Sequence, residues 1–248
     1  MSPDWSAKPE AVPYSSLADP QTLNLYAYAN NSPTTKRDLD GHWMGWEHVQ
    51  LTQLAYDRAG IRRNASVVTA VRNVDGGGYN PYTGYIFHHQ AFNAAQDAPG
   101  SQPDHFLRNA GQSQMSAYQD GMSRLTSDAN SARAALISGD TKAFDAAMGG
   151  AGHLIQDSFA HTDRDGGTGD ITHIRCYTCS GAEMDHQHPA FMTDATQGLL
   201  SPEAQGSVNA TADFLTLMNG AAGMTNAQFQ QGLQNYENKW FQQQLPQK

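Results

Sequence analysis

Long hydrophobic runs are missing from this chain of 248 residues. No stretch of about 18 apolar residues occurs, so the sequence offers no candidate membrane-spanning helix. Residues 1–5 also lack the charged-then-apolar order of a secretory signal, so we expect any delivery outside the cell to depend on another carrier. A hydrophobic content of 39% is nevertheless enough for the core of one sizeable domain.

Basic residues are scarce. Lys and Arg together number 15, against 24 Asp and Glu, which gives a formal net charge of −9. A protein that binds a nucleic-acid backbone over a broad surface needs clustered Lys and Arg, whereas here they are scattered. The charge therefore argues against such a surface. It does not exclude a nuclease, because bound divalent cations would offset much of a site's acidic charge.

Cysteine is limited to Cys176 and Cys179, spaced as a single C-x2-C. This pair fits half a zinc knuckle, a redox pair or a local disulfide. Because no second pair completes a four-cysteine site, the sequence favours a disulfide or two plain thiols over metal ligation.

Residues 1–41 differ in composition from the rest of the chain. Prolines and turn-forming residues surround one apolar run there, which alternates loosely as a short strand would. Between Asp75 and Pro103 we expect a long polar and aromatic loop, of a kind that is often functional. Little sequence after residue 41 has the pattern of paired strands. We therefore predict an all-α fold with a short irregular N-terminal segment.

Helical spacing of apolar residues appears in several segments. It predicts a helix from Trp46 that ends by Gly60, two long helices over 112–137 and 141–161, a helix over about 202–218 and a surface helix from Asn226. Asp140 is the expected N-cap of the second long helix.

His153, Asp157 and His161 recur every four residues within that second long helix. At about 3.6 residues per turn they share one face, while Leu154 and Phe159 cover the opposite, apolar side. Burying two imidazoles and a carboxylate without partners is costly, so a cation is their natural companion. A core helix whose histidines bond to the backbone is the alternative. Three such residues at this spacing favour metal binding.

The positions of Trp43 and His48 resemble the zinc-dependent phospholipase C and single-strand nuclease superfamily. In that superfamily the mature chain starts with a Trp whose amine and carbonyl bind zinc, together with a His shortly downstream. Trp43 precedes His48 by five residues, which is similar to the nuclease branch. Asp75 resembles the family's bridging aspartate and His105 the histidine after it. The resemblance covers roughly residues 43–220.

This resemblance implies a compact multi-helix bundle of the zinc-dependent phospholipase C type that binds two or three zinc ions. The implied ligands are Trp43, His48, Asp75, His105, His153, Asp157 and His161. Asp157 would bridge two ions about 3.5–4 Å apart, the spacing of two-metal sites, and Asp75 would orient or deprotonate the attacking water. The family's last motif, a His followed four residues later by Glu or Asp, is absent. Asp185 and His186 are the best substitutes, and His173 is the second choice.

Residues 1–42 resemble the end of the core of Rhs/YD-repeat shell proteins, on the segments 19–33 and 38–42. Those proteins enclose a variable C-terminal toxin and cut themselves just after a D-x-x-G-like element. Leu39 stands here where that element usually has Pro. The resemblance implies that residues 43–248 form the effector domain, with an immunity protein as a possible partner.

The leading hypothesis is a zinc-dependent phospholipase C that hydrolyses the glycerol–phosphate ester of membrane phospholipids, as the toxic part of a secreted or delivered Rhs effector. Its partner would be a phospholipid membrane surface and not a nucleic acid. Tyr79, Tyr82 and Tyr85 in the long loop are candidates for lipid contact, or for packing that loop. Two alternatives stay open: a single-strand nuclease of the same superfamily, and a non-catalytic Rhs fragment held by structural zinc.

Overall fold

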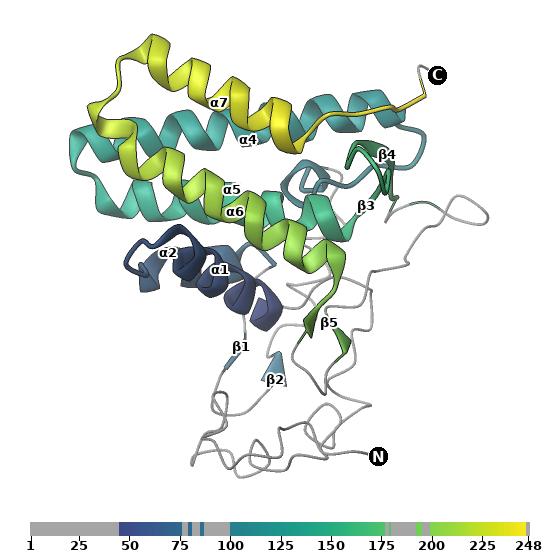
Figure 1. The fold of residues 1–248 in the computed structure, drawn as a ribbon, viewed down its shortest axis with the longest axis horizontal. Coiled ribbons are helices and arrows are strands. Elements are labelled where there is room, and N and C mark those ends of the chain that lie inside the picture. Colours follow the sequence, from purple (N-terminus) through teal and green to yellow (C-terminus); the bar gives the residue numbers. More distant parts are fainter. Residues whose placement is uncertain are drawn as a thin grey trace.

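The computed structural model describes residues 45–75, 79–80, 85–86, 100–176, 179, 192–194 and 199–246. Most of these residues are helical, which agrees with the predicted all-α class (Figure 1). The Rhs-like segment and the predicted domain boundary at residue 42 lie outside the described residues. In the described part, no helix is both long enough and apolar enough to cross a membrane.

Helix α1 (Gly45–Ala59) ends where the sequence predicts, at Gly60, whose positive φ of 66° suits a residue without a side chain. Helix α2 (Ala65–Asn73) was not predicted. Asn64 caps it by accepting hydrogen bonds from the backbone N–H groups of Ser66 and Val67. Three buried valines on one face then hold this short helix against its neighbours.

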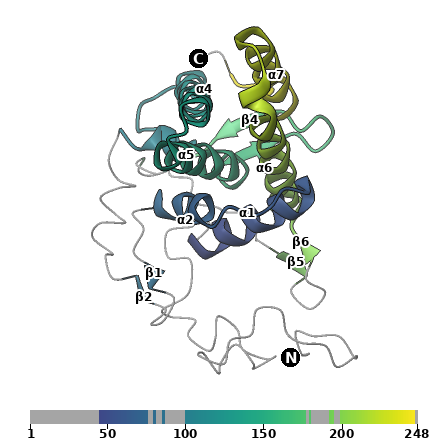
Figure 2. The same cartoon turned by 90° about the vertical axis from the view of Figure 1, so that its left-hand side faces the viewer.

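Helices α4 (Gln114–Ser138) and α5 (Thr141–Ala160) form the predicted pair. They are joined by Gly139, with φ of 76°, and by Asp140, whose side chain accepts from Ala143 N–H as the expected N-cap. A short 3-10 turn, η3 (Gln102–His105), precedes α4. Figure 2 shows α5 lying between α4 and α2, with α6 beside it. The helix that carries the histidine motif is therefore the central one.

Helix α6 (Pro202–Gly220) and helix α7 (Asn226–Trp240) confirm the two remaining helix predictions. A turn, η5 (Ala221–Gly223), separates them, and Thr225 with Gln228 forms a capping box at the start of α7. Helix α6 packs against α1 and α5, and α7 packs against α6.

Among the described residues, three short antiparallel strand pairs accompany the helices, although the sequence showed little strand pattern. They are β1 (Tyr79–Asn80) with β2 (Tyr85–Ile86), β3 (Thr162–Arg164) with β4 (Ile171–Ile174), and β5 (Met192–Asp194) with β6 (Leu199–Leu200). Their shortness explains the missing signal, because alternation is recognisable only over about four to eight residues. Helix α5 ends at Ala160, His161 is its C-cap, and strand β3 begins at the next residue, Thr162.

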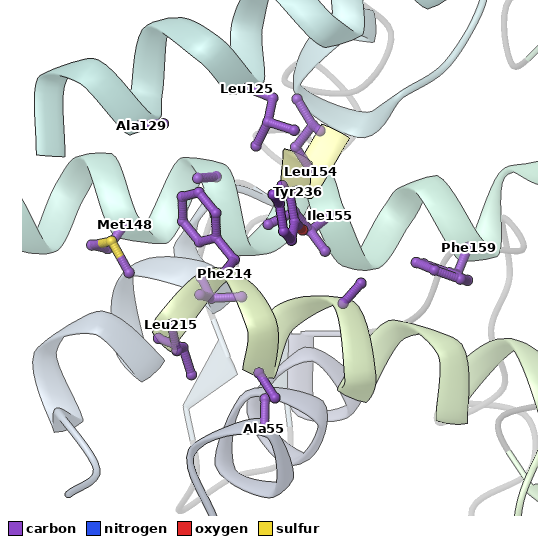
Figure 3. Close-up of a cluster of buried hydrophobic side chains, with 14 of the residues drawn as sticks. Ala55, Leu125, Ala129, Met148, Leu154, Ile155, Phe159, Phe214, Leu215 and Tyr236 are labelled. Atoms are coloured by element: carbon purple, nitrogen blue, oxygen red, sulfur yellow. The ribbon is translucent and has the colours of Figure 1, made fainter. Parts of the chain in front are cut away.

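The second half of α5 is buried on all sides, from Ala151 to Ala160. Figure 3 shows Leu154 and Ile155 of α5 in one apolar cluster with Leu125 of α4 and Phe214 of α6. The polar motif residues of α5 consequently lie inside the molecule, with a hydrophobic core on the opposite face.

A glycine lets α2 approach α5 closely. A Cβ atom added at Gly149 would lie 2.5 Å from the Cβ of Ala70, which is far closer than packed side chains allow. The absence of that atom brings the backbone of α2 against α5. As a result, the carbonyl of Val71 comes within hydrogen-bond distance of His153, at 3.0 Å.

Candidate metal centre

Six of the predicted site residues meet in one buried cluster, although they come from four parts of the chain. Helix α1 supplies one, the turn after α2 another, η3 a third, and α5 with its C-cap the rest. All are at most 4% exposed: His48, Asp75, His105, His153, Asp157 and His161. These side chains include two groups with the donor atoms and spacing to hold a metal ion, namely His48, His153 and Asp157, and Asp75, His105 and His153.

The two carboxylate oxygens of Asp157 face different histidines. Oδ2 lies 2.9 Å from His105 Nδ1 and 2.9 Å from His153 Nε2. Oδ1 lies 3.3 Å from His48 Nε2 and 3.7 Å from His161 Nε2. Asp157 therefore stands between two imidazole pairs, with one oxygen directed at each.

Asp75 supplies the second carboxylate of the cluster. Its Oδ1 lies 3.2 Å from His153 Nε2 and 3.9 Å from His105 Nδ1, and its Oδ2 lies 3.9 Å from His48 Nε2. Like Asp157, it is close to histidines of both potential donor groups. The cluster thus contains two acidic groups that reach the same imidazoles.

Hydrogen bonds from the far side of the rings orient two of the histidines. His153 Nδ1 lies 3.0 Å from the carbonyl oxygen of Val71, and His48 Nδ1 lies 2.7 Å from Oε1 of Gln156. An oxygen acceptor requires the proton to be on Nδ1, so both rings direct Nε2 into the cluster. Metal-binding histidines characteristically make a bond of this kind through their second nitrogen.

The charges of the cluster favour a cation. Burial raises the pKa of Asp157, but the His153, His161 and His48 imidazoles outweigh it and hold the pKa well below its usual range. Burial also raises the pKa of Asp75, but His153 and His48 outweigh it and hold this pKa below its usual value. Burial lowers the pKa of His153, yet Asp157 and Asp75 overcome this and hold it well above the usual value. Two ionised carboxylates therefore attract a positive occupant, either a proton on His153 or a metal ion.

Of the remaining predicted ligands, the structure describes only His173. His173 lies on β4, where its Nδ1 is 3.4 Å from Asp163 Oδ2 and 35% of its side chain is exposed. It belongs to neither of the two potential metal-binding groups. Trp43, Asp185 and His186 lie outside the described residues. The ligands proposed for a third ion are therefore not assembled by the described residues.

Cys176 and Cys179 form a disulfide, which is one of the two states that the sequence favoured over metal ligation. The adjoining residue Arg175 donates its backbone N–H to the carbonyl of His161, and its own carbonyl accepts from Arg108 N–H. These bonds connect the disulfide segment with the end of α5 and with the residues that follow His105.

Sequence reasoning missed two polar residues at the centre, Thr52 and Gln156. Both are buried, and they hydrogen-bond to each other and to His48. The available signals were weak: Thr52 lies one helical turn after His48, and Gln156 is a polar residue within an apolar run beside Asp157.

Comparison with family models, curated proteins and solved structures found no match in any of the three. The superfamily and Rhs resemblances therefore stay sequence-based hypotheses, and the geometry of the cluster is the basis for assigning a function.

Proposed function

We propose that this protein is a zinc-dependent phosphodiesterase of the phospholipase C type. The observation that carries this proposal is the arrangement around Asp157, whose two oxygens face separate imidazole pairs. A carboxylate placed in this way suits a bridge between two cations. Two neighbouring ions are characteristic of enzymes that cleave phosphate esters.

The donor set is suited to zinc. Imidazole nitrogen and carboxylate oxygen are its usual ligands alongside thiolate, and both cysteines are engaged in the disulfide. Six side chains are more than one tetrahedral ion needs. We therefore propose two ions held by the cluster, with a third if Trp43, or Asp185 and His186, complete a further site.

Bound zinc would neutralise the charge of a phosphodiester and activate a water molecule near neutral pH. The protein's own side chains provide the framework. Asp157 fixes the positions of the four imidazoles around it, and Asp75, ionised and close to both donor groups, is placed to orient the water and accept its proton. The apolar core behind α5 keeps bulk water from that side of the cluster.

The substrate that we propose is a membrane phospholipid. A net charge of −9 disfavours a polyanionic nucleic acid as the main partner, whereas a phospholipid presents a single phosphodiester. The resemblance of residues 1–42 to an Rhs core further suggests a delivered effector with an immunity protein. A single-strand nuclease is the second candidate, because the Trp43 to His48 spacing is similar to that branch.

The test combines metal analysis with a substrate panel. Purified protein should contain two or three zinc ions per chain and should hydrolyse phosphatidylcholine or phosphatidylethanolamine to a diacylglycerol and a phosphorylated headgroup. Cleavage of single-stranded DNA alone would establish the nuclease alternative. Bound zinc without hydrolysis of any substrate would favour a structural role, and one metal ion or none per chain would contradict the multinuclear centre.

A further inference from the structure

His48 takes part in a closed ring of three buried hydrogen bonds. Its Nδ1 lies 2.7 Å from Gln156 Oε1, Gln156 Nε2 lies 2.8 Å from Thr52 Oγ1, and Thr52 Oγ1 lies 2.7 Å from the carbonyl oxygen of His48. Thr52 and Gln156 are 1% and 0% exposed. Side chains on α1 and α5 therefore join into one small network behind the metal-facing atoms.

Only one arrangement of protons satisfies this ring. A carbonyl oxygen accepts but never donates, so the single hydroxyl proton of Thr52 must point to the carbonyl of His48. The Thr52 oxygen must then accept from the amide NH2 of Gln156, which turns the amide oxygen toward His48. That oxygen can only accept, so Nδ1 of His48 carries a proton.

With Nδ1 protonated, a neutral His48 has its lone pair on Nε2, the atom that lies 3.3 Å from Asp157 and 3.9 Å from Asp75. A lone pair facing carboxylate oxygens is stable when a cation lies between them. We propose that Thr52 and Gln156 are positioning residues that fix the tautomer and ring plane of His48 and thereby set the affinity of its side of the metal centre. This inference rests on the proposed metal-dependent function.

A comparison with His153 shows why the two side chains have this influence. The Nδ1 of His153 bonds to a backbone carbonyl, that of Val71, whose position is fixed by α2. The orientation of His48 depends instead on two side chains of opposite helices. Loss of either one leaves the acceptor at Nδ1 missing or able to turn, so the position of the proton on His48 is no longer fixed. The His48 side of the centre should consequently lose its ion first.

Two substitutions test the positioning role of Thr52 and Gln156. Gln156→Met keeps the length of the side chain and removes the acceptor, and Thr52→Val keeps its shape and removes the hydroxyl. Loss of a residue that orients a metal ligand typically weakens metal binding about 10–100-fold, so we expect zinc affinity to fall by that factor in a chelator competition. Thr52→Ser retains the hydroxyl and should restore wild-type affinity.

Thr216→Val is the matched control. Thr216 makes the same bond as Thr52, from its hydroxyl to the carbonyl four residues earlier, at 2.9 Å, and it lies on α6. Its replacement should leave zinc affinity unchanged. A similar loss of affinity in this control and in Thr52→Val would show that the effect reflects helix stability, and it would overturn the proposal.

A measurement on the metal-free protein tests the positioning role of Thr52 and Gln156 independently of the proposed enzymatic activity. Imidazole ¹⁵N shifts should show a proton on Nδ1 of His48 in the wild type. The tautomers should mix in Thr52→Val and Gln156→Met, even if the wild type hydrolyses nothing. A wild-type His48 without a proton on Nδ1, or unchanged affinity and tautomer in the variants, would overturn the positioning role of Thr52 and Gln156 while leaving the zinc-dependent function intact. If Gln156→Met does not fold, the Thr52→Val and Thr52→Ser pair still decides.

Discussion

Replacing Asp157 by Asn would test the shared carboxylate directly. The substitution keeps the size of the side chain and one of its oxygens, but it removes the charge that faces four imidazoles within 3.7 Å. The amide nitrogen would also direct its protons at one imidazole pair. If Asp157 bridges two ions, this one change should weaken both of them.

The magnitude follows from ligand linkage. Zinc at about 100 times its dissociation constant stabilises the native state by about 2.7 kcal/mol per ion, and two ions by about twice that amount. In a domain of about 150–250 residues, 1 kcal/mol corresponds to about 2–4 °C in Tm, so one ion should raise the Tm by about 5–11 °C. We expect the wild type to gain the two-ion shift and Asp157→Asn to gain less than the shift of a single ion.

The assay is thermal unfolding with and without zinc, paired with elemental analysis. The control is Asp128→Asn, the same chemical change at a partly buried aspartate of α4 that pairs with Arg124, at 3.1 Å. This control should keep the full zinc-dependent shift. An Asp157→Asn protein with wild-type zinc content and a wild-type shift would refute the bridging role.

Two further predictions concern His153 and the amino group that a cut before Trp43 would release. His153→Ala should abolish hydrolysis while circular dichroism shows helical content near that of the wild type, because α5 keeps its packing against α4 and α6; loss of the fold would instead favour a structural centre. Protein cut to begin at Trp43 should bind more zinc and turn over faster than protein that retains residues 1–42, since an amide nitrogen lacks the available lone pair of a free amine. Equal zinc content and equal rates in the two forms would exclude such activation.

The parts that could be predicted from the sequence are those with a repeating local pattern. Apolar spacing predicts helices α1, α4, α5, α6 and α7, and the expected N-cap Asp140 marks the junction between α4 and α5. Helix α2 was not predicted, because its nine residues give little more than two turns of helical periodicity. The β3–β4 strand pair was not predicted, because its strands are only three and four residues long.

The six residues of the buried cluster could be selected from the sequence in two different ways. Three members lie on one face of α5 and follow from periodicity alone, whereas His48, Asp75 and His105 were selected only through a resemblance. The structure brings all six together in one buried cluster. His173 shows the limit of selection by residue type, because the fold places it in a pair with Asp163.

Thr52 and Gln156 lay beyond sequence reasoning for a physical reason. Their contribution is the direction of two hydrogen bonds, and direction depends on which acceptor lies opposite each donor in the folded chain. Threonine and glutamine are ordinary residues on helices, so neither type signals a role. The closed ring of three hydrogen bonds forms only when α1 and α5 are packed together. The carbonyl of His48 then determines the direction of the Thr52 proton, and this in turn fixes the Gln156 amide and the imidazole proton. A metal centre of this kind is thus specified in two layers: ligand types that a sequence can suggest, and proton positions that only the packed helices define.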